Sequence, residues 1–181
     1  MAYPKGYEWL GTVGLLPLVV SEGLRLIGIV ETPGPKSTPA IMQWRDELAG
    51  AGIRIVGYSD DSIPWCGLFM AIVAQRAGKP VVANPLWARN WAKFGTASPQ
   101  ASLGDVLVFE RGSGGHVGIY IGEDASAYHV LGGNQSDRVC ITRVAKARCI
   151  AVRRPPFKIA LPASARPYHL AATGALSRNE A

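Results

Sequence analysis

The sequence has few cysteines and few histidines, and it lacks the common metal and nucleotide motifs. Its 181 residues include three cysteines and three histidines. Three cysteines are too few for a disulfide-stapled small protein, and their odd number leaves one thiol unpaired within the chain, which favours a reducing compartment. No His-Glu-x-x-His, paired Cys-x-x-Cys or phosphate-binding glycine motif occurs. The sequence therefore predicts no metal and no cofactor.

A long hydrophobic run is also missing. The apolar stretch Leu10–Val20 contains Pro17 and is shorter than the about 20 residues that a transmembrane helix needs. Because Glu8 offsets Lys5 before it and no small-residue cleavage site follows, we expect neither a membrane span nor a signal peptide. The composition fits a globular protein, since 48% of the residues are hydrophobic and only 18% are charged, which excludes a disordered chain.

Acidic residues are almost absent from the last quarter of the chain. Residues 1–137 hold ten Lys and Arg against twelve Asp and Glu (net −2), whereas residues 138–181 hold nine against one (net +8). Such a basic strip suits an anionic wall polymer or a lipid surface, and the alternative is a solubilising tail. Nucleic acid is a less favoured partner, because few aromatic residues interrupt the strip.

Hydrophobic spacing predicts helices in the first half of the chain and strands in the second. Helical spacing, broken by prolines and glycines, covers residues 17–30, 39–49, 64–77 and 85–94. Alternation predicts strands over residues 105–110, 117–122, 127–131, 139–144 and 149–153. This order indicates an α+β domain, with helices packed on an antiparallel sheet of about five strands. We expect the domain to span residues 1–155 and a basic, Ala/Pro-rich arm to follow over 156–181.

Two pairs of residues could each be read in two ways. Trp87 and Trp91, four residues apart, would share a helix face. We expect that face to lie in the core, and a sugar-stacking surface is the alternative. Cys140 and Cys149 flank a predicted turn, so they could pair across a hairpin, although two small apolar residues are the commoner case.

Cys66 falls in the first turn of a predicted helix. Pro64 suits the first helical position, with Ser62 or Ile63 as the cap. The unpaired N–H groups and the dipole at a helix start favour a thiolate, which is the nucleophilic form of cysteine. The alternative role for Cys66 is that of a buried core residue.

His116 and Asn134 occupy positions that could complete a site with Cys66. His116 opens a predicted strand after a glycine-rich turn, where it can face a cleft on the same side as Gly118 and Tyr120. Asn134 follows Gly132-Gly133, and its neutral amide could orient an imidazole. Taken singly, His116 is an ordinary surface histidine and Asn134 a turn residue. His129 is expected to be a packed or surface histidine.

Several segments together resemble a known family. Asp-Asp-Ser-Ile-Pro-Trp-Cys-Gly-Leu-Phe at 60–69, Gly-Asp-Val-Leu-Val-Phe at 104–109, Gly-His-Val-Gly-Ile-Tyr-Ile-Gly at 115–122 and Val-Leu-Gly-Gly-Asn-Gln at 130–135 resemble the NlpC/P60–CHAP superfamily of papain-like cell-wall hydrolases. Residues 31–37 and 87–95 also fit its phage-associated branch. The likeness spans roughly residues 15–155 and does not extend into 156–181.

The resemblance implies a papain-like α+β fold and a cysteine peptidase or amidase that cleaves a peptide or amide bond of peptidoglycan. Cys66 would be the nucleophile and His116 the base, with the backbone N–H of Cys66 as an oxyanion donor. Asn134 matches the residue that orients the histidine. Many NlpC/P60 enzymes have a histidine there, so Gln135 and Asp137 are alternatives.

The resemblance also suggests a biological setting. We expect a phage or prophage endolysin, held in the host cytoplasm until lysis and then acting on peptidoglycan or its muropeptides. A secreted or periplasmic enzyme is the alternative location. The alternative function is an inactive papain-like module that binds the cell wall.

Overall fold

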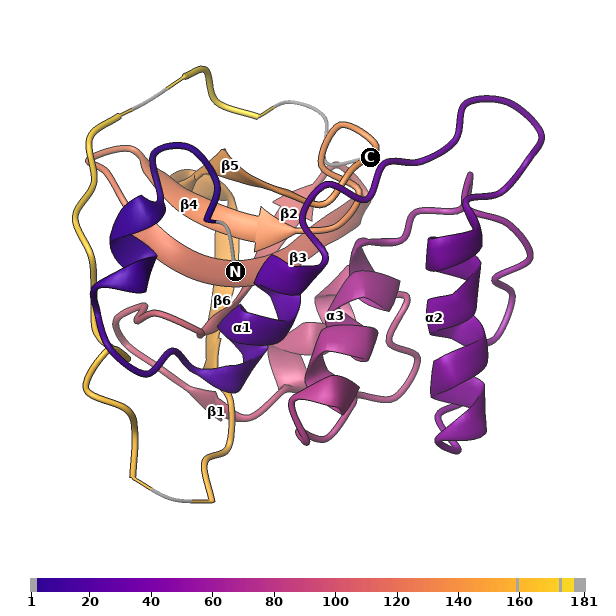
Figure 1. Ribbon diagram of the computed structural model, residues 1–181, viewed down its shortest axis with the longest axis horizontal. Helices are drawn as coiled ribbons and strands as arrows, with labels where there is room; N and C mark the ends of the chain where they lie inside the picture. Colours follow the sequence, from indigo (N-terminus) through magenta and orange to yellow (C-terminus); the bar gives the residue numbers. More distant parts are fainter. Residues whose placement is uncertain (1–2, 159, 173, 178–181) are drawn as a thin grey trace.

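In the computed structural model, which describes residues 3–158, 160–172 and 174–177, helices precede most of the strands (Figure 1). The α-helices are α1 (Leu18–Arg25), α2 (Pro39–Gly50) and α3 (Cys66–Arg76). Three short 3-10 helices are η1 (Glu8–Gly11), η2 (Ala88–Lys93) and η3 (Lys146–Arg148). Helix α3 lies between α2 and the sheet, so its faces are buried on both sides.

The strands form one antiparallel sheet in the order β1-β6-β2-β3-β4-β5. They are β1 (Thr96–Ala97), β2 (Val106–Arg111), β3 (Gly114–Glu123), β4 (Ala127–Gly132), β5 (Cys140–Ala145) and β6 (Cys149–Arg154). The α+β class and the five predicted strands are confirmed. The sixth strand, β1, has only two residues, which is too short to produce an alternating pattern.

Three of the predicted helices differ from the observed ones by two residues or more at one end or at both. Helix α1 ends at Arg25 rather than near Val30, because Val30 instead forms a β-bridge with Arg138. Helix α3 begins at Cys66, two residues after Pro64, and Trp65 takes the capping position expected for Ser62 or Ile63. In the fourth predicted helix, only residues 88–93 are helical, and they form a 3-10 helix.

The two faces of the sheet contribute to two separate cores. On β3, Val117, Ile119 and Ile121 join the main core beneath the helices, whereas Tyr120 lies in a second cluster on the opposite face with Phe109. This alternation is the one predicted for the strand, since successive side chains point to opposite faces.

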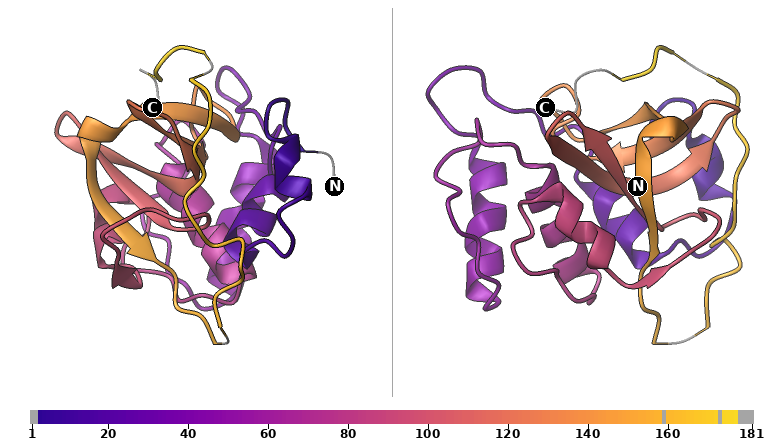
Figure 2. Two further views of the ribbon diagram at one scale, coloured as in Figure 1. Left: turned by 90° about the vertical axis from the view of Figure 1, so that its left-hand side faces the viewer. Right: turned by 180° about the vertical axis from the view of Figure 1, so that it is seen from behind.

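The sheet is strongly curved, which lets short η3 connect strands that are not neighbours (Figure 2). Cys140 on β5 lies opposite Gly132 of β4, and Cys149 on β6 lies opposite Phe109 of β2. The two cysteines therefore do not face each other across a hairpin, and both thiols are free.

The C-terminal segment, expected to lie outside the domain, runs along its surface (Figure 2). Ser164 donates a hydrogen bond to the Leu15 carbonyl, and the Glu123 backbone pairs with Tyr168 and Leu170. Farther along, the Ser177 N–H donates to the Arg143 carbonyl. The described part of the segment is thus hydrogen-bonded to the domain at several points. Within the described ranges, the helices are all too short or too polar to cross a membrane.

Candidate active site

Aromatic packing fixes the start of α3. Trp65, which is completely buried, contacts Trp44 of α2 with ring centroids 6.0 Å apart. Its indole N–H donates to the Glu31 carboxylate at 2.8 Å. Partial burial raises the pKa of Glu31, while this hydrogen bond acts in the opposite direction. No side chain caps the helix, so packing around Trp65 sets the position of Cys66.

The Cys66 thiol is buried at the first residue of α3, with 2% of the residue exposed. Burial raises its pKa, and hydrogen bonding from the backbone N–H groups of Val117, Gly67 and Cys66 itself lowers it less. The expectation that the helix start favours a thiolate is therefore wrong for the resting protein, because desolvation outweighs the local N–H groups.

The Val117 N–H can reach Cys66 because β4 ends beside it. The Tyr120 N–H donates to the Asp105 carbonyl on the β2 side, so alternation directs the Val117 N–H toward β4. Pairing between β3 and β4 reaches only as far as Ile119, opposite Leu131. The sulfur therefore lies beyond the end of the β3–β4 pairing, beside the peptide that joins His116 to Val117.

His116 is completely buried, although the sequence suggested that it would face a cleft. Its ring stacks on Phe109 of β2, with centroids 6.2 Å apart and an interplanar angle of 28°. The Gln135 Oε1 atom lies 3.0 Å from His116 Nε2. The imidazole is thus held by a ring contact and by a hydrogen bond.

The hydrogen bonds of Gln135 define the tautomer of His116. The Gln135 amide nitrogen donates to the carbonyls of Cys140 at 2.6 Å and Val130 at 3.2 Å. With both N–H groups used, the amide oxygen is the atom that faces His116, and it can only accept. His116 Nε2 must then carry the proton, which leaves Nδ1 as the basic nitrogen of the neutral ring. A neutral imidazole with one unprotonated ring nitrogen can act as a general base.

The three residues named as partners for His116, which are Asn134, Gln135 and Asp137, lie in one turn together with Ser136. Asn134, Ser136 and Asp137 have φ angles of 56°, 54° and 58°, in the left-handed region. Asn134 is buried and Asp137 is exposed. The contact with the His116 ring described above comes from Gln135, which the sequence suggested as an alternative to Asn134.

Two glycines allow this turn to approach the site. A Cβ atom on Gly132 would lie 2.9 Å from Gln135 Oε1 and 3.3 Å from His116 Nε2. A Cβ atom on Gly133 would lie 2.5 Å from Cβ of Phe69 in α3. The Gly-Gly pair therefore fits between the imidazole and α3, where side chains would separate the two.

The segment from Pro85 to Arg89 closes the other side. A Cβ atom on Gly67, next to Cys66, would lie 2.2 Å from the Pro85 carbonyl oxygen. Arg89 donates to the carbonyls of Gly114 at 2.7 Å and Gly112 at 3.1 Å, which fixes the turn before His116. This segment thus connects the start of α3 with the start of β3.

A second buried histidine belongs to a separate network. His129 lies 2.7 Å from the Tyr7 hydroxyl and 3.1 Å from Asp124 Oδ2, and Arg143 donates to the same Asp124 oxygen at 2.7 Å. Burial lowers the pKa of His129 and raises that of Tyr7 to about 12, while Arg143 holds the pKa of Asp124 well below its usual range. His129 is therefore a packed histidine.

Several basic side chains of the strip form ion pairs or hydrogen bonds within the protein. Arg154 pairs with Asp105 at 2.9 Å and Lys146 with Glu123 at 2.5 Å. Arg153 donates to the carbonyls of Phe94 and Gly95. These contacts reduce the charge that the strip offers to an anionic partner.

The groove described for this structure lies away from Cys66. A groove of about 610 Å³ lies at the other end of α3, lined by residues 15–18, 76–80, 156–158, 160 and 162. The described residues contain no group of three or more His, Cys, Asp or Glu side chains placed to hold a metal ion.

No known family model matches the chain, and neither does any curated protein.

Proposed function

We propose that the protein is a papain-like cysteine peptidase or amidase that hydrolyses a peptide or amide bond of peptidoglycan. The observation that carries this proposal is the hydrogen bond between His116 Nε2 and Gln135, on a histidine whose peptide link to Val117 lies beside the Cys66 sulfur. The motif resemblance to NlpC/P60–CHAP hydrolases supplies the substrate class. Its phage-associated branch also favours an endolysin that reaches the wall at lysis.

Catalysis would begin with proton transfer from the Cys66 thiol to His116 Nδ1. The thiolate attacks the carbonyl carbon of the substrate amide and forms a C–S bond, while N–H groups at the start of α3 stabilise the oxyanion. The C–N bond then breaks, and the imidazolium returns its proton to the leaving amine. Water, deprotonated by His116, attacks the thioester and releases a carboxylic acid, which restores the Cys66 thiol.

Gln135 would act as the positioning residue. Its neutral amide holds the ring without adding charge, so the imidazole and the thiol can exchange a proton without a fixed ionic partner. The raised pKa of Cys66 means that the resting thiol is neutral and that His116 must supply the activation. Asn134, buried in the same turn, remains a second candidate for this role.

A clearing assay with purified cell walls tests the hydrolase. Wild type should lower the turbidity of the wall suspension and release new amine or carboxyl ends that mass spectrometry identifies. The Cys66→Ala variant should lose at least about 1,000-fold in rate, because no nucleophile remains. Circular dichroism should show that it stays folded. Equal clearing by the two proteins would overturn the proposal.

The closed state of the site favours one other candidate, a papain-like module that binds the wall without cleaving it. Cys66, His116 and Gln135 are each at most 2% exposed, so a substrate must displace part of the surroundings to reach the sulfur. Wall pull-down by wild type with no released fragments would select the binding module. Fragment release would select the hydrolase.

A further inference from the structure

Trp87 differs from the other tryptophans in its exposure. Trp44, Trp65 and Trp91 are buried and Trp9 is partly buried, whereas Trp87 is 70% exposed. The expectation that Trp87 shares a core face with Trp91 is wrong, because the backbone of Trp87 is extended and the helix begins only at the next residue. An isolated exposed apolar residue is common, so exposure alone assigns no role.

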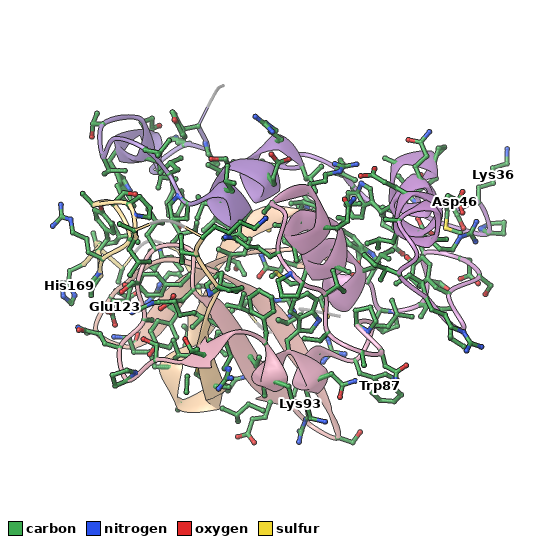
Figure 3. All side chains as sticks on the ribbon, turned by 90° about the horizontal axis from the view of Figure 1, so that it is seen from below. Lys36, Asp46, Trp87, Lys93, Glu123 and His169 are labelled. Carbon is green, nitrogen blue, oxygen red and sulfur yellow. The ribbon has the colours of Figure 1, made fainter. Side chains whose placement is uncertain are left out.

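Trp87 lies on a segment that is close to both Cys66 and His116 in the sequence elements it touches. On one side of Trp87, the Pro85 and Leu86 carbonyl oxygens lie so close to Gly67, the residue after Cys66, that a Cβ atom there would collide with them. On the other side, the Ala88 and Arg89 side chains lie close to Gly115, which precedes His116: a Cβ atom on Gly115 would be 3.4 Å and 3.0 Å from them. Trp87 therefore lies on the short segment that bridges the two catalytic elements, and its indole points outward at the rim of the molecule (Figure 3).

The segment that carries Trp87 is held firmly. The Trp87 N–H donates to the Asn84 carbonyl at 3.2 Å, and its carbonyl accepts from the Asn90 N–H at 2.9 Å. The Asn90 side chain donates to the carbonyls of Ala83 and Asn84, and the Trp91 indole donates to the Pro85 carbonyl. A ligand that binds Trp87 would not have to order this backbone first, so little binding energy is lost.

We propose that Trp87 is a stacking platform for a sugar ring of the glycan strand, a role that rests on the proposed hydrolase function. The flat indole offers an open π-face, which suits the C–H groups on the apolar face of a pyranose. Asn84, exposed one turn earlier, carries an amide that can bind hydroxyl or N-acetyl groups.

The direction of the Trp87 side chain favours a glycan over the stem peptide as the ligand. The scissile amide must reach the Cys66 sulfur, which lies on the inner side of the segment from Pro85 to Arg89. Trp87 projects to the outside of that segment, where the glycan of a cross-linked polymer would remain.

A binding experiment that needs no catalysis tests the platform. The full-length Cys66→Ala protein is titrated with the β-1,4-linked tetramer of N-acetylglucosamine, with calorimetry and tryptophan fluorescence as readouts. Adding Trp87→Ala should raise the Kd at least about tenfold, while Trp87→Phe should stay within about threefold because it keeps an aromatic face. Undiminished binding by the Trp87→Ala protein, or no binding by its parent, would overturn the platform.

An activity ratio separates this proposal from the hydrolase itself. We expect Trp87→Ala to lower kcat/KM on glycan-linked peptide, relative to sugar-free stem peptide, about tenfold. Val56→Ala, which trims another exposed apolar side chain, should leave the ratio unchanged. An equal loss on both substrates would assign Trp87 to the peptide and overturn the glycan platform. If wild type cleaves neither substrate, the hydrolase proposal fails, while the tetramer titration still decides the platform.

Discussion

His116 and His129 are both buried, on neighbouring strands of one sheet, yet their surroundings differ in charge. The neutral amide of Gln135 contacts His116, and the Cys66 sulfur lies beside the peptide between His116 and Val117. The ionised Asp124 contacts His129, and a tyrosine hydroxyl lies at the other ring nitrogen. The Tyr7–His129–Asp124 row has the residue types of a hydrolase triad, with a hydroxyl, an imidazole and a carboxylate in sequence.

The two partners of His129, Asp124 and Tyr7, are poorly suited to proton transfer. Arg143 binds the Asp124 oxygen that faces His129, so that carboxylate is already neutralised by a guanidinium. Burial raises the pKa of Tyr7 to about 12, which makes it a poor nucleophile at neutral pH. A row of suitable residue types is therefore not a catalytic site unless the electrostatics leave one proton free to move.

Exchanging each histidine for glutamine should separate the two roles most strongly. His116→Gln removes the base and should lower wall-clearing activity at least about 1,000-fold, with the fold retained by circular dichroism. His129→Gln should keep activity within a few-fold and lower the free energy of unfolding by about 1–3 kcal/mol, because buried partners lose hydrogen bonds. Similar activities for the two variants would contradict the distinction.

Removing the charge of Asp124 should produce the next largest effect, on stability. Asp124→Asn leaves Arg143 largely buried without its anion and should cost about 3 kcal/mol at pH 7, measured by chemical denaturation. The pKa of Asp124 is lowered in the folded state, so its contribution is present above about pH 4 and is lost as the pH falls. The variant should therefore lose less stability than wild type between pH 5 and pH 2.

Asp46 provides the control for that experiment. It pairs with Arg45 on the surface, where 65% of its side chain is exposed. Asp46→Asn should change the unfolding free energy by less than about 1 kcal/mol. A loss equal to that of Asp124→Asn would show that burial of the Asp124 pair is unimportant.

Truncating Gln135 should reduce catalysis without removing it. Gln135→Ala leaves His116 free to adopt the other tautomer and should lower kcat about 100-fold, within the range of general acid–base effects. Asn134→Gly, which suits the left-handed backbone there, should cost less than about tenfold. The reverse ranking would assign the orienting role to Asn134. Gln135→Glu should shift the pH–rate profile to higher pH, because a carboxylate favours imidazolium.

Alkylation rates should show the smallest difference. Cys140 and Cys149 are more exposed than Cys66, and burial raises the pKa of all three thiols, that of Cys149 to about 11. Exposure alone thus predicts that Cys66 reacts last. Activation by His116 should instead make Cys66 react with iodoacetamide about fivefold faster than the others at pH 6.5, as mapped by mass spectrometry. The His116→Gln variant should lose this advantage.

The sequence predicted the α+β class, the five longer strands and the division of the β3 side chains between two faces, because periodicity reports directly on burial. It favoured Asn134 over Gln135 as the residue that orients His116, whereas the described contact with the ring comes from Gln135. Val130 lies in the same cluster as Phe109, and Gly132 meets the His116 ring, so alternation along β4 brings residue 134 to the His116 face. The left-handed backbone at Asn134 interrupts that alternation, and no hydrophobic pattern encodes such a turn.

Other features depended on tertiary packing. The Tyr7–His129 contact joins residues 122 positions apart, and the burial of Cys66 arises from β3 and from the segment at Pro85. No local signal carries such information. The pKa of Cys66 was therefore mispredicted, since helix position was visible in the sequence and desolvation was not.

The absence of a side chain at Gly67 has a consequence for how this protein could be altered. A single methyl group there would collide with the Pro85 and Leu86 carbonyl oxygens. The collision would displace the segment from Pro85 to Arg89, which carries Trp87. The proposed reactivity of Cys66 and the proposed sugar contact of Trp87 thus depend on the same close contact between backbones. Substitutions around Trp87 would have to preserve this backbone-to-backbone spacing, or they would also displace Cys66.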